Sequence, residues 1–143
     1  MNRILPVITV LISLAVIGCE TMSTSSHDVK PDPDAVAIAN KWLSIVDAGN
    51  YAGAYQRMAI RVRTAELEQQ HITFLRAHRA PLGRPLSRDL SRAVFSHTMA
   101  GAPDGDYEFL VYKTHFEHKS RGLEIVGLTK ESGHWEVYNY RFN

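Results

Sequence analysis

The spacing of hydrophobic and polar positions changes about halfway along the chain. The first half carries apolar side chains at helical spacing, at Ala35, Ile38, Ala39, Trp42, Ile45 and Val46. Asp32 and Pro33 suit an N-cap and a first helical position, and Gly49 suits a left-handed end. This pattern predicts a first helix that begins near residue 34. Residues 51–58 predict a short second helix.

A third helix is expected from Thr64 to Arg79. Acidic residues fall in its first turn and basic residues in its last, as the helix dipole favours. Its expected inward stripe consists of Leu67, His71, Phe74, Leu75 and His78. Pro81 and Gly83 end it.

After Gly83 the apolar positions alternate, as in strands. The strands are expected at residues 90–99, 106–118, 123–130 and 134–142. Residues 106–118 are apolar on both faces, which favours a central strand covered on both sides for part of its length. Helices followed by hairpin-linked strands predict an α+β fold, with three N-terminal helices packed on a curved antiparallel four-stranded meander.

The first 18 residues have the features of a signal peptide. Arg3 gives a positive start, and the apolar run of residues 4–16 is shorter than the roughly 20 residues of a membrane span. Residues 19–33 are rich in Ser, Thr, Asp and Pro and predict a flexible tether. The expected organisation is therefore signal peptide 1–18, tether 19–33 and a single domain 34–143.

The motif Val16-Ile17-Gly18-Cys19 resembles the lipobox of bacterial lipoproteins. The resemblance implies cleavage before Cys19 and attachment of acyl chains to it, and several such chains anchor a protein firmly. Glu20 follows, where Asp would resemble the inner-membrane retention signal, so the expected location is the outer membrane facing the periplasm. The alternative is a free thiol in an ordinary signal peptide.

Composition narrows the function classes. Hydrophobic residues make up 45% of the chain, which excludes a disordered protein. Removal of Arg3 from the 16 Lys and Arg residues leaves 15, against 15 Asp and Glu. A neutral mature chain gives no reason to expect nucleic-acid binding. With a single cysteine, no disulfide within the chain is possible.

Four spaced segments resemble one bacterial family, the domain-of-unknown-function family numbered 4019. They lie at residues 39–51, 79–83, 101–107 and 133–140. The family name carries no activity, so no catalytic residue is transferred. The order of elements also resembles the cystatin-like cone of ketosteroid isomerase and nuclear transport factor 2, which implies a pocket and leaves the reaction open.

The histidines do not suggest a metal site. His115 and His118 fall on opposite faces of a strand, and His71 and His78 lie two turns apart on a helix. No Gly-x-Ser-x-Gly elbow and no phosphate-binding glycine loop is present, and no cofactor is expected. The catalytic candidates are His115 as a base and Tyr112 as a donor. The sheet carboxylates are expected at solvated positions, at Glu108, Glu117, Glu124 and Glu136.

Eight arginines and no lysine lie between positions 57 and 92. The planar guanidinium suits carboxylates and phosphates. Arg79, Arg84 and Arg88 are therefore candidates for binding an anionic envelope component or an acidic partner. The alternative is a solvated basic face balanced by acids elsewhere.

Two hypotheses follow. The first is a lipid-anchored envelope protein whose domain binds a partner or forms a homodimer without catalysis. The alternative is a small-molecule enzyme, similar to an isomerase or dehydratase, that uses the interior of the cone. A carboxylate or His115 beside a tyrosine in a closed pocket would favour the enzyme. A filled interior and an exposed apolar sheet face would favour binding.

Overall fold

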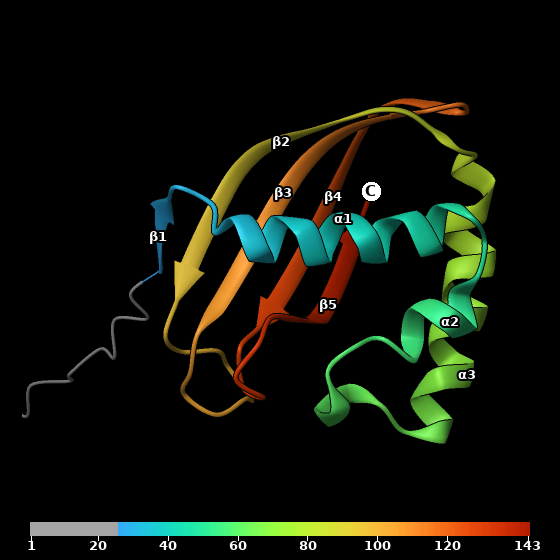
Figure 1. Cartoon of the computed structure of the whole chain (residues 1–143). Helices are drawn as coiled ribbons and strands as arrows, with labels where there is room; N and C mark the ends of the chain where they lie inside the picture. Colours follow the sequence, from blue (N-terminus) through green and yellow to red (C-terminus); the bar gives the residue numbers. More distant parts are fainter. Residues whose placement is uncertain (1–25) are drawn as a thin grey trace, which may run out of the picture.

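The computed structural model describes residues 26–143, which run from a short strand through helices to four long strands (Figure 1). In chain order the elements are β1 Ser26–Val29, α1 Pro33–Asp47, α2 Tyr51–Tyr55, the 3-10 turn η1 Ile60–Val62, α3 Ala65–Phe74, the π-helical turn η2 Leu75–Arg79, the 3-10 turn η3 Ala80–Leu82, β2 Pro85–Ser96, β3 Tyr107–Phe116, β4 Lys119–Thr129 and β5 Glu136–Phe142. The predicted signal peptide and the predicted lipidation site, Cys19, lie outside the described residues.

The strands form one antiparallel sheet in the order β1-β2-β3-β4-β5. The α+β class is confirmed, and β3 is the middle strand. The prediction of three N-terminal helices on a four-stranded meander is wrong, because β1 adds a fifth strand and the helices lie between β1 and β2.

Strand β1 falls within residues 19–33, where the sequence suggested a tether. Its four residues, Ser-His-Asp-Val, show no apolar alternation that could have predicted a strand. Pairing with β2 provides the missing stabilisation, and the ring of His27 packs edge-on against Phe95 at 6.1 Å between centroids. Tertiary pairing, and not local propensity, makes this strand.

Helix α1 lies across one face of the sheet (Figure 1). It begins as predicted: the Asp32 carboxylate accepts the N–H of Asp34 at 2.8 Å, and Pro33 occupies the first turn. Its buried stripe consists of Ala35, Ala39, Trp42, Leu43 and Val46. Trp42 Nε1 donates to the carbonyl of Ala54 at 2.8 Å and so ties α2 to α1.

The third helix begins at the predicted cap, Thr64, but its inward stripe was predicted correctly only in part. Leu75 is buried as expected, whereas Leu67 is 43% exposed and Phe74 is 50% exposed. Ile72 and Arg79, which were not in the predicted stripe, are buried. After Phe74 the backbone widens into the π-helical turn η2. Such a turn adds a residue to the helical repeat and changes which side chains face the sheet.

Strand β2 is longer than predicted and begins at Pro85. A bulge between Leu90 and Arg92 interrupts its alternation, so the two halves of the strand follow different parities. The sequence pattern therefore revealed only the second half. The bulge keeps Arg88 and Ala93 on the helix-covered face although five positions separate them.

The space between α1 and the sheet is filled by side chains. The residues that meet there are buried and form one cluster, which includes Trp42, Leu43, Leu110, Tyr112, Val126 and Tyr140. We call this helix-covered face the inner face of the sheet. The opposite face of β2 to β5, which we call the outer face, has no helix over it within residues 26–143 (Figure 1).

Candidate functional site

A carboxylate lies at the centre of the inner face. Glu124 on β4 is 0% exposed and accepts three short hydrogen bonds: from Arg88 Nε at 2.6 Å, from Thr114 Oγ1 at 2.6 Å and from the Tyr140 hydroxyl. The partners come from three other strands, so this one side chain joins β2, β3, β4 and β5. The expectation that Glu124 is solvated was wrong.

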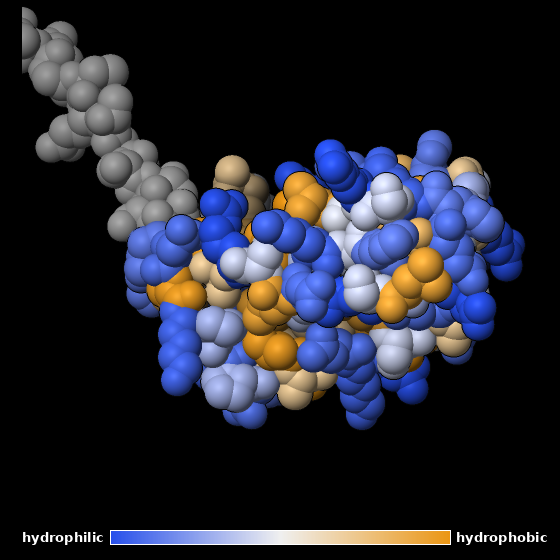
Figure 2. Space-filling view, turned by 90° about the horizontal axis from the view of Figure 1, so that it is seen from above, coloured by the Kyte–Doolittle hydropathy of each residue, from blue (hydrophilic) through white to orange (hydrophobic). Residues whose placement is uncertain are grey.

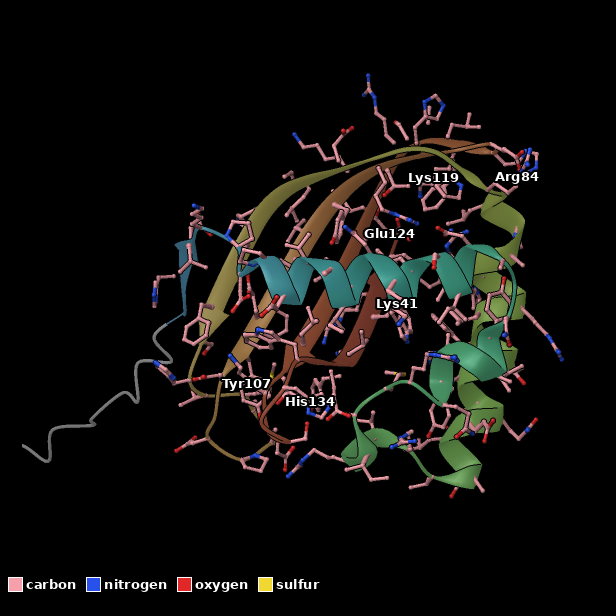
Figure 3. All side chains as sticks on the ribbon, viewed as in Figure 1. Lys41, Arg84, Tyr107, Lys119, Glu124 and His134 are labelled. Atoms are coloured by element: carbon pink, nitrogen blue, oxygen red, sulfur yellow. The ribbon has the colours of Figure 1, made fainter. Side chains whose placement is uncertain are left out.

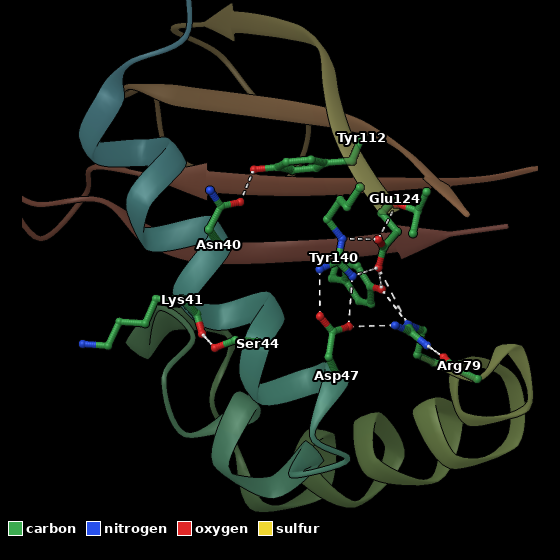
Figure 4. Close-up of polar contacts among 11 residues, drawn as sticks. Asn40, Lys41, Ser44, Asp47, Arg79, Tyr112, Glu124 and Tyr140 are labelled. Atoms are coloured by element: carbon green, nitrogen blue, oxygen red, sulfur yellow. Dashed lines mark hydrogen bonds and ion pairs between the residues drawn. The ribbon is translucent and has the colours of Figure 1, made fainter. Parts of the chain in front are cut away.

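Asp47, at the end of α1, extends this cluster into a buried ionic network (Figure 4). Arg88 donates two hydrogen bonds of 2.7 and 2.9 Å to Asp47 and also donates to Glu124. Arg79 donates to Asp47 at 2.8 Å and to the Tyr140 hydroxyl at 3.2 Å. Two carboxylates thus face two guanidiniums, and the charges balance.

The guanidinium of Arg79 is fixed on three sides. Besides its bonds to Asp47 and Tyr140, it donates to the carbonyl of Gly83 at 2.9 Å and lies 4.4 Å from the centre of the Phe116 ring. The π-helical turn η2 carries Arg79, and the side chain is buried. The turn therefore directs a charge from the helices into the network on the sheet.

The pKa values of two groups in the network, Glu124 and Tyr140, are shifted in opposite directions. Burial alone would raise the pKa of Glu124, but the hydrogen bonds from Arg88, Thr114 and Tyr140 outweigh it, and the pKa lies below its usual value of 4.5. Burial and the nearby Glu124 carboxylate raise the pKa of Tyr140. Glu124 is ionised and Tyr140 is protonated throughout the physiological range. A carboxylate with this low affinity for protons is a poor general base.

The two catalytic candidates on β3 do not meet. Tyr112 points to the inner face, where its hydroxyl donates to Asn40 Oδ1 at 3.1 Å (Figure 4), and burial raises its pKa to about 12. His115 is exposed on the outer face. Strand geometry separates them because residues at odd spacing point to opposite faces. The closed pocket that would join a tyrosine to His115 is therefore not formed by these two residues.

Two further polar groups are buried by packing. His71 lies between the rings of Trp42 and Tyr55, at 6.5 and 5.4 Å between centroids, and burial lowers its pKa. Glu108 is buried, contrary to expectation, and accepts the N–H of Asp32 at 3.0 Å. Glu108 joins the start of α1 to the sheet, and His71 joins α3 to α1 and α2.

The predicted anion-binding arginines already have partners. Arg79 and Arg88 belong to the buried network. Arg84 is 79% exposed and lies at the rim of the molecule (Figure 3), where it donates to Glu117 Oε1 at 2.8 and 3.0 Å. Its own backbone N–H also donates to Glu117, and these bonds lower the pKa of that carboxyl. A role of the three in binding an external anion stays a prediction.

The outer face presents an apolar floor. Val94, Phe109, Val111 and Ile125 line a hollow of about 370 Å³ with Arg92 and Arg141 on its two sides. Gly127 belongs to the floor because the Phe109 ring lies over it, 3.1 Å from where a Cβ would stand. Figure 2 shows apolar side chains gathered in patches within a largely hydrophilic surface.

The same face becomes polar toward the β3–β4 hairpin. There a hollow of about 510 Å³ is lined by hydroxyl, amide and charged side chains, among them Ser87, Asp89, Lys113, His115, Ser120 and Arg121. A smaller hollow of about 180 Å³ shares Ile125 and Arg141 with the apolar end and Leu123 with the polar end. The three hollows share lining residues and follow one another along the strands, and together we call them the outer groove.

Sequence reasoning missed Asp47 and Glu124. The signal for Glu124 was its parity: it shares a face of β4 with Val126 and Leu128, so it had to be buried with them. A buried carboxylate requires a cationic partner, and the arginine-rich segment before the sheet could have supplied it. Asp47 carried no comparable signal, since the last turn of an amphipathic helix often ends in a polar residue.

Within residues 26–143 no three side chains of His, Cys, Asp or Glu gather closely enough to hold a metal ion. In the same part of the chain, no helix is both long and apolar enough to cross a bilayer.

The fold and the site define a small α+β domain with one helix-covered sheet face, a buried ionic network and an open groove. The comparison with protein families matches residues 38–140 to "Protein of unknown function (DUF4019)". The chain belongs to this family, which confirms the resemblance of the four sequence segments. The searches of curated proteins and of solved structures found no match.

Proposed function

We propose that this protein is a lipid-anchored component of the bacterial cell envelope whose domain is a non-catalytic binding module. The observation that carries the proposal is the contrast between the packed inner face and the open outer groove. The floor of Val94, Phe109, Val111 and Ile125 has no covering element within residues 26–143. An apolar surface of this kind, rimmed by polar residues, marks an interaction site.

The inner face supports a non-catalytic role. An isomerase or dehydratase in the interior of the cone would need a reachable carboxylate or histidine base beside a tyrosine. Glu124 lies beside Tyr140, but every bond it makes is to a protein donor, and its pKa is lowered. The space around it is occupied by Trp42, Tyr112 and Val126.

The lipid anchor is proposed from the lipobox-like motif that ends at Cys19, and Glu20 supports the outer membrane as the destination. Residues 20–25 separate Cys19 from β1. They would hold the domain close to the membrane surface, because six residues span at most roughly 20 Å even when fully extended.

The experiment is fractionation of cells that express wild-type chain, Cys19→Ala and the matched control Thr21→Ala. We expect wild type and Thr21→Ala to partition into the detergent phase of envelope extracts, and Cys19→Ala to leave it. Unchanged partitioning of Cys19→Ala would contradict the anchor.

The binding role is tested with Nile red, an uncharged apolar dye, on the chain from position 19 carrying Cys19→Ser. We expect the fluorescence of the dye to rise when the wild-type protein is added and to rise less when Val111→Glu is added. The matched control is Leu67→Glu, which places the same acid on the exposed side of α3 and should leave the signal unchanged. Equal signals from all three proteins would contradict a binding role for the outer groove.

A further inference from the structure

The outer groove has a polarity that runs along the strands. Residues of the outer face form four rows across the sheet, set by the strand register. The first two rows are mainly polar and contain Ser87 with His115 and then Asp89 with Lys113, although Leu123 stands beside Lys113 in the second row. The last two rows are apolar in the middle and contain Val111 with Ile125 and then Val94 with Phe109.

The length of the groove fits one acyl chain with a headgroup. Alternate residues of a strand lie roughly 6.7 Å apart, so four rows span roughly 20 Å. The acyl chains of one membrane leaflet fill about 15 Å, half of the hydrocarbon core. The two apolar rows lie one step of roughly 7 Å apart, so they and Met99 beyond them would contact part of such a chain, while the polar rows remain for the headgroup.

The charges of the lining favour an anion. Four permanently cationic side chains line the hollows, Arg92, Lys113, Arg121 and Arg141, against one acidic side chain, Asp89. Arg92 has only a loose contact with Asp28 at 3.7 Å, and both side chains are largely exposed. Arg141 makes no ion pair within the described residues. This cationic excess lies directly beside an apolar floor, which is the arrangement that an anionic amphiphile complements.

The donors at the polar end favour phosphate. Lys113 and Arg121 bring cationic N–H groups, and Ser87, Ser120 and His115 bring hydroxyl and ring donors. Several donors of different directions suit the oxygens of a phosphate with a hydroxyl-bearing headgroup better than the flat pair of oxygens in a carboxylate.

The same charges disfavour a second copy of this chain. In a two-fold interface the same patch occurs on both partners. Stacking two outer faces would bring eight cationic side chains together against two copies of Asp89. Such a contact would lose more from repulsion than its apolar floor gains.

Resting on the proposed binding function, we propose that the outer groove binds a single-chain anionic phospholipid, with its acyl chain on Val94, Phe109, Val111 and Ile125 and its phosphate headgroup beside Lys113 and Arg121. A lipid-anchored protein near a membrane would meet this ligand at its own surface.

The test is calorimetric titration with lysophosphatidylglycerol below its micelle concentration, on the chain from position 19 carrying Cys19→Ser. We expect one equivalent to bind. Val111→Glu should weaken binding at least tenfold, and Lys113→Gln with Arg121→Gln should weaken it roughly threefold to tenfold. The controls Leu67→Glu and Lys41→Gln, both on the helix side, should bind as wild type does.

Two comparison ligands identify the headgroup chemistry. Zwitterionic lysophosphatidylcholine and the carboxylate palmitate should each bind at least threefold more weakly. Equal affinity for the three ligands would overturn the assignment of the headgroup site. If Nile red binding still depended on Val111, the proposed binding function would stand. Loss of both signals would overturn the two proposals together. A wild-type dimer by sedimentation that Val111→Glu dissociates would identify a second copy as the occupant and also overturn the inference.

Discussion

The two faces of the sheet both carry arginines, but the arginines of the inner face are paired with carboxylates and those of the outer face are not closely paired. On the inner face, Arg79 and Arg88 meet Asp47 and Glu124, and every charge has a partner at 2.6–2.9 Å. On the outer face, Arg92 and Arg141 flank an apolar floor; Arg92 has only a loose, exposed contact with Asp28 at 3.7 Å, and Arg141 has no ion pair among the described residues. Paired charges hold a fold together, while unpaired charges beside apolar surface remain free for a ligand. The inner face is therefore the scaffold and the outer face the site.

The largest expected effect is on the inner face. Glu124→Leu keeps a similar volume but removes the acceptor of four hydrogen bonds and leaves Asp47 as the remaining carboxylate beside Arg88 and Arg79. Removing one partner of a buried ion pair costs about 3–5 kcal/mol. Urea denaturation should show this loss in the free energy of unfolding. The control Glu117→Gln changes an exposed carboxylate at the rim and should lose far less, and an equal loss in the two variants would contradict a structural network.

The second prediction concerns coupling inside the network. The double variant Arg88→Met with Glu124→Leu should be more stable than the sum of the single losses predicts, by about 0.5–3 kcal/mol, because the second change removes the charge that the first leaves unpaired. A double-mutant cycle by urea denaturation measures it. Strict additivity would mean that Arg88 and Glu124 act independently.

The third prediction concerns pH. The pKa of Glu124 is lowered in the folded protein, so its contribution to stability is present above the usual value of 4.5 and is lost as the pH falls through the folded-state pKa. The stability difference between wild type and Glu124→Leu should therefore be constant from pH 5 to 7 and shrink below pH 4.5. Denaturation at a series of pH values checks this. A difference that grows with acid would contradict the lowered pKa.

The fourth and smallest effect on stability lies on the outer face. Gly127→Ala places a methyl group 3.1 Å from the Phe109 ring and should tilt that ring into the outer groove. We expect a change in unfolding free energy within about 1 kcal/mol, because the ring can move into solvent. Lysophosphatidylglycerol affinity should fall several-fold. If calorimetry shows an unchanged affinity, Phe109 does not contribute to ligand binding on the groove floor.

The elements with strong local signals were predictable. The Asp32 cap and Pro33 located the start of α1, and two-sided apolarity located β3 as the central strand. The elements that depend on partners were not. Strand β1 exists because β2 offers an edge, and the π-helical turn η2 shifts the phase of the third helix only in the context of Arg79.

The candidate site followed the same division. Tyr112 and His115 were recognisable as chemical groups, but the strand places them on opposite faces. Glu124 was read as solvated because charged residues in alternating strands usually face water, but its parity with Val126 and Leu128 and its register beside Tyr112 bury it. The apolar odd positions of β3 indicated the floor of the outer groove. Its cationic residues come from four different strands, and only the strand register brings them together.

The most direct test of the account is amide chemical-shift mapping of the chain from position 19, carrying Cys19→Ser, as lysophosphatidylglycerol is added. The account predicts shifts concentrated on Val94, Phe109, Val111 and Ile125, with Leu43 and Glu124 on the inner face unmoved. Shifts centred on the inner face, or none at saturating ligand, would contradict it.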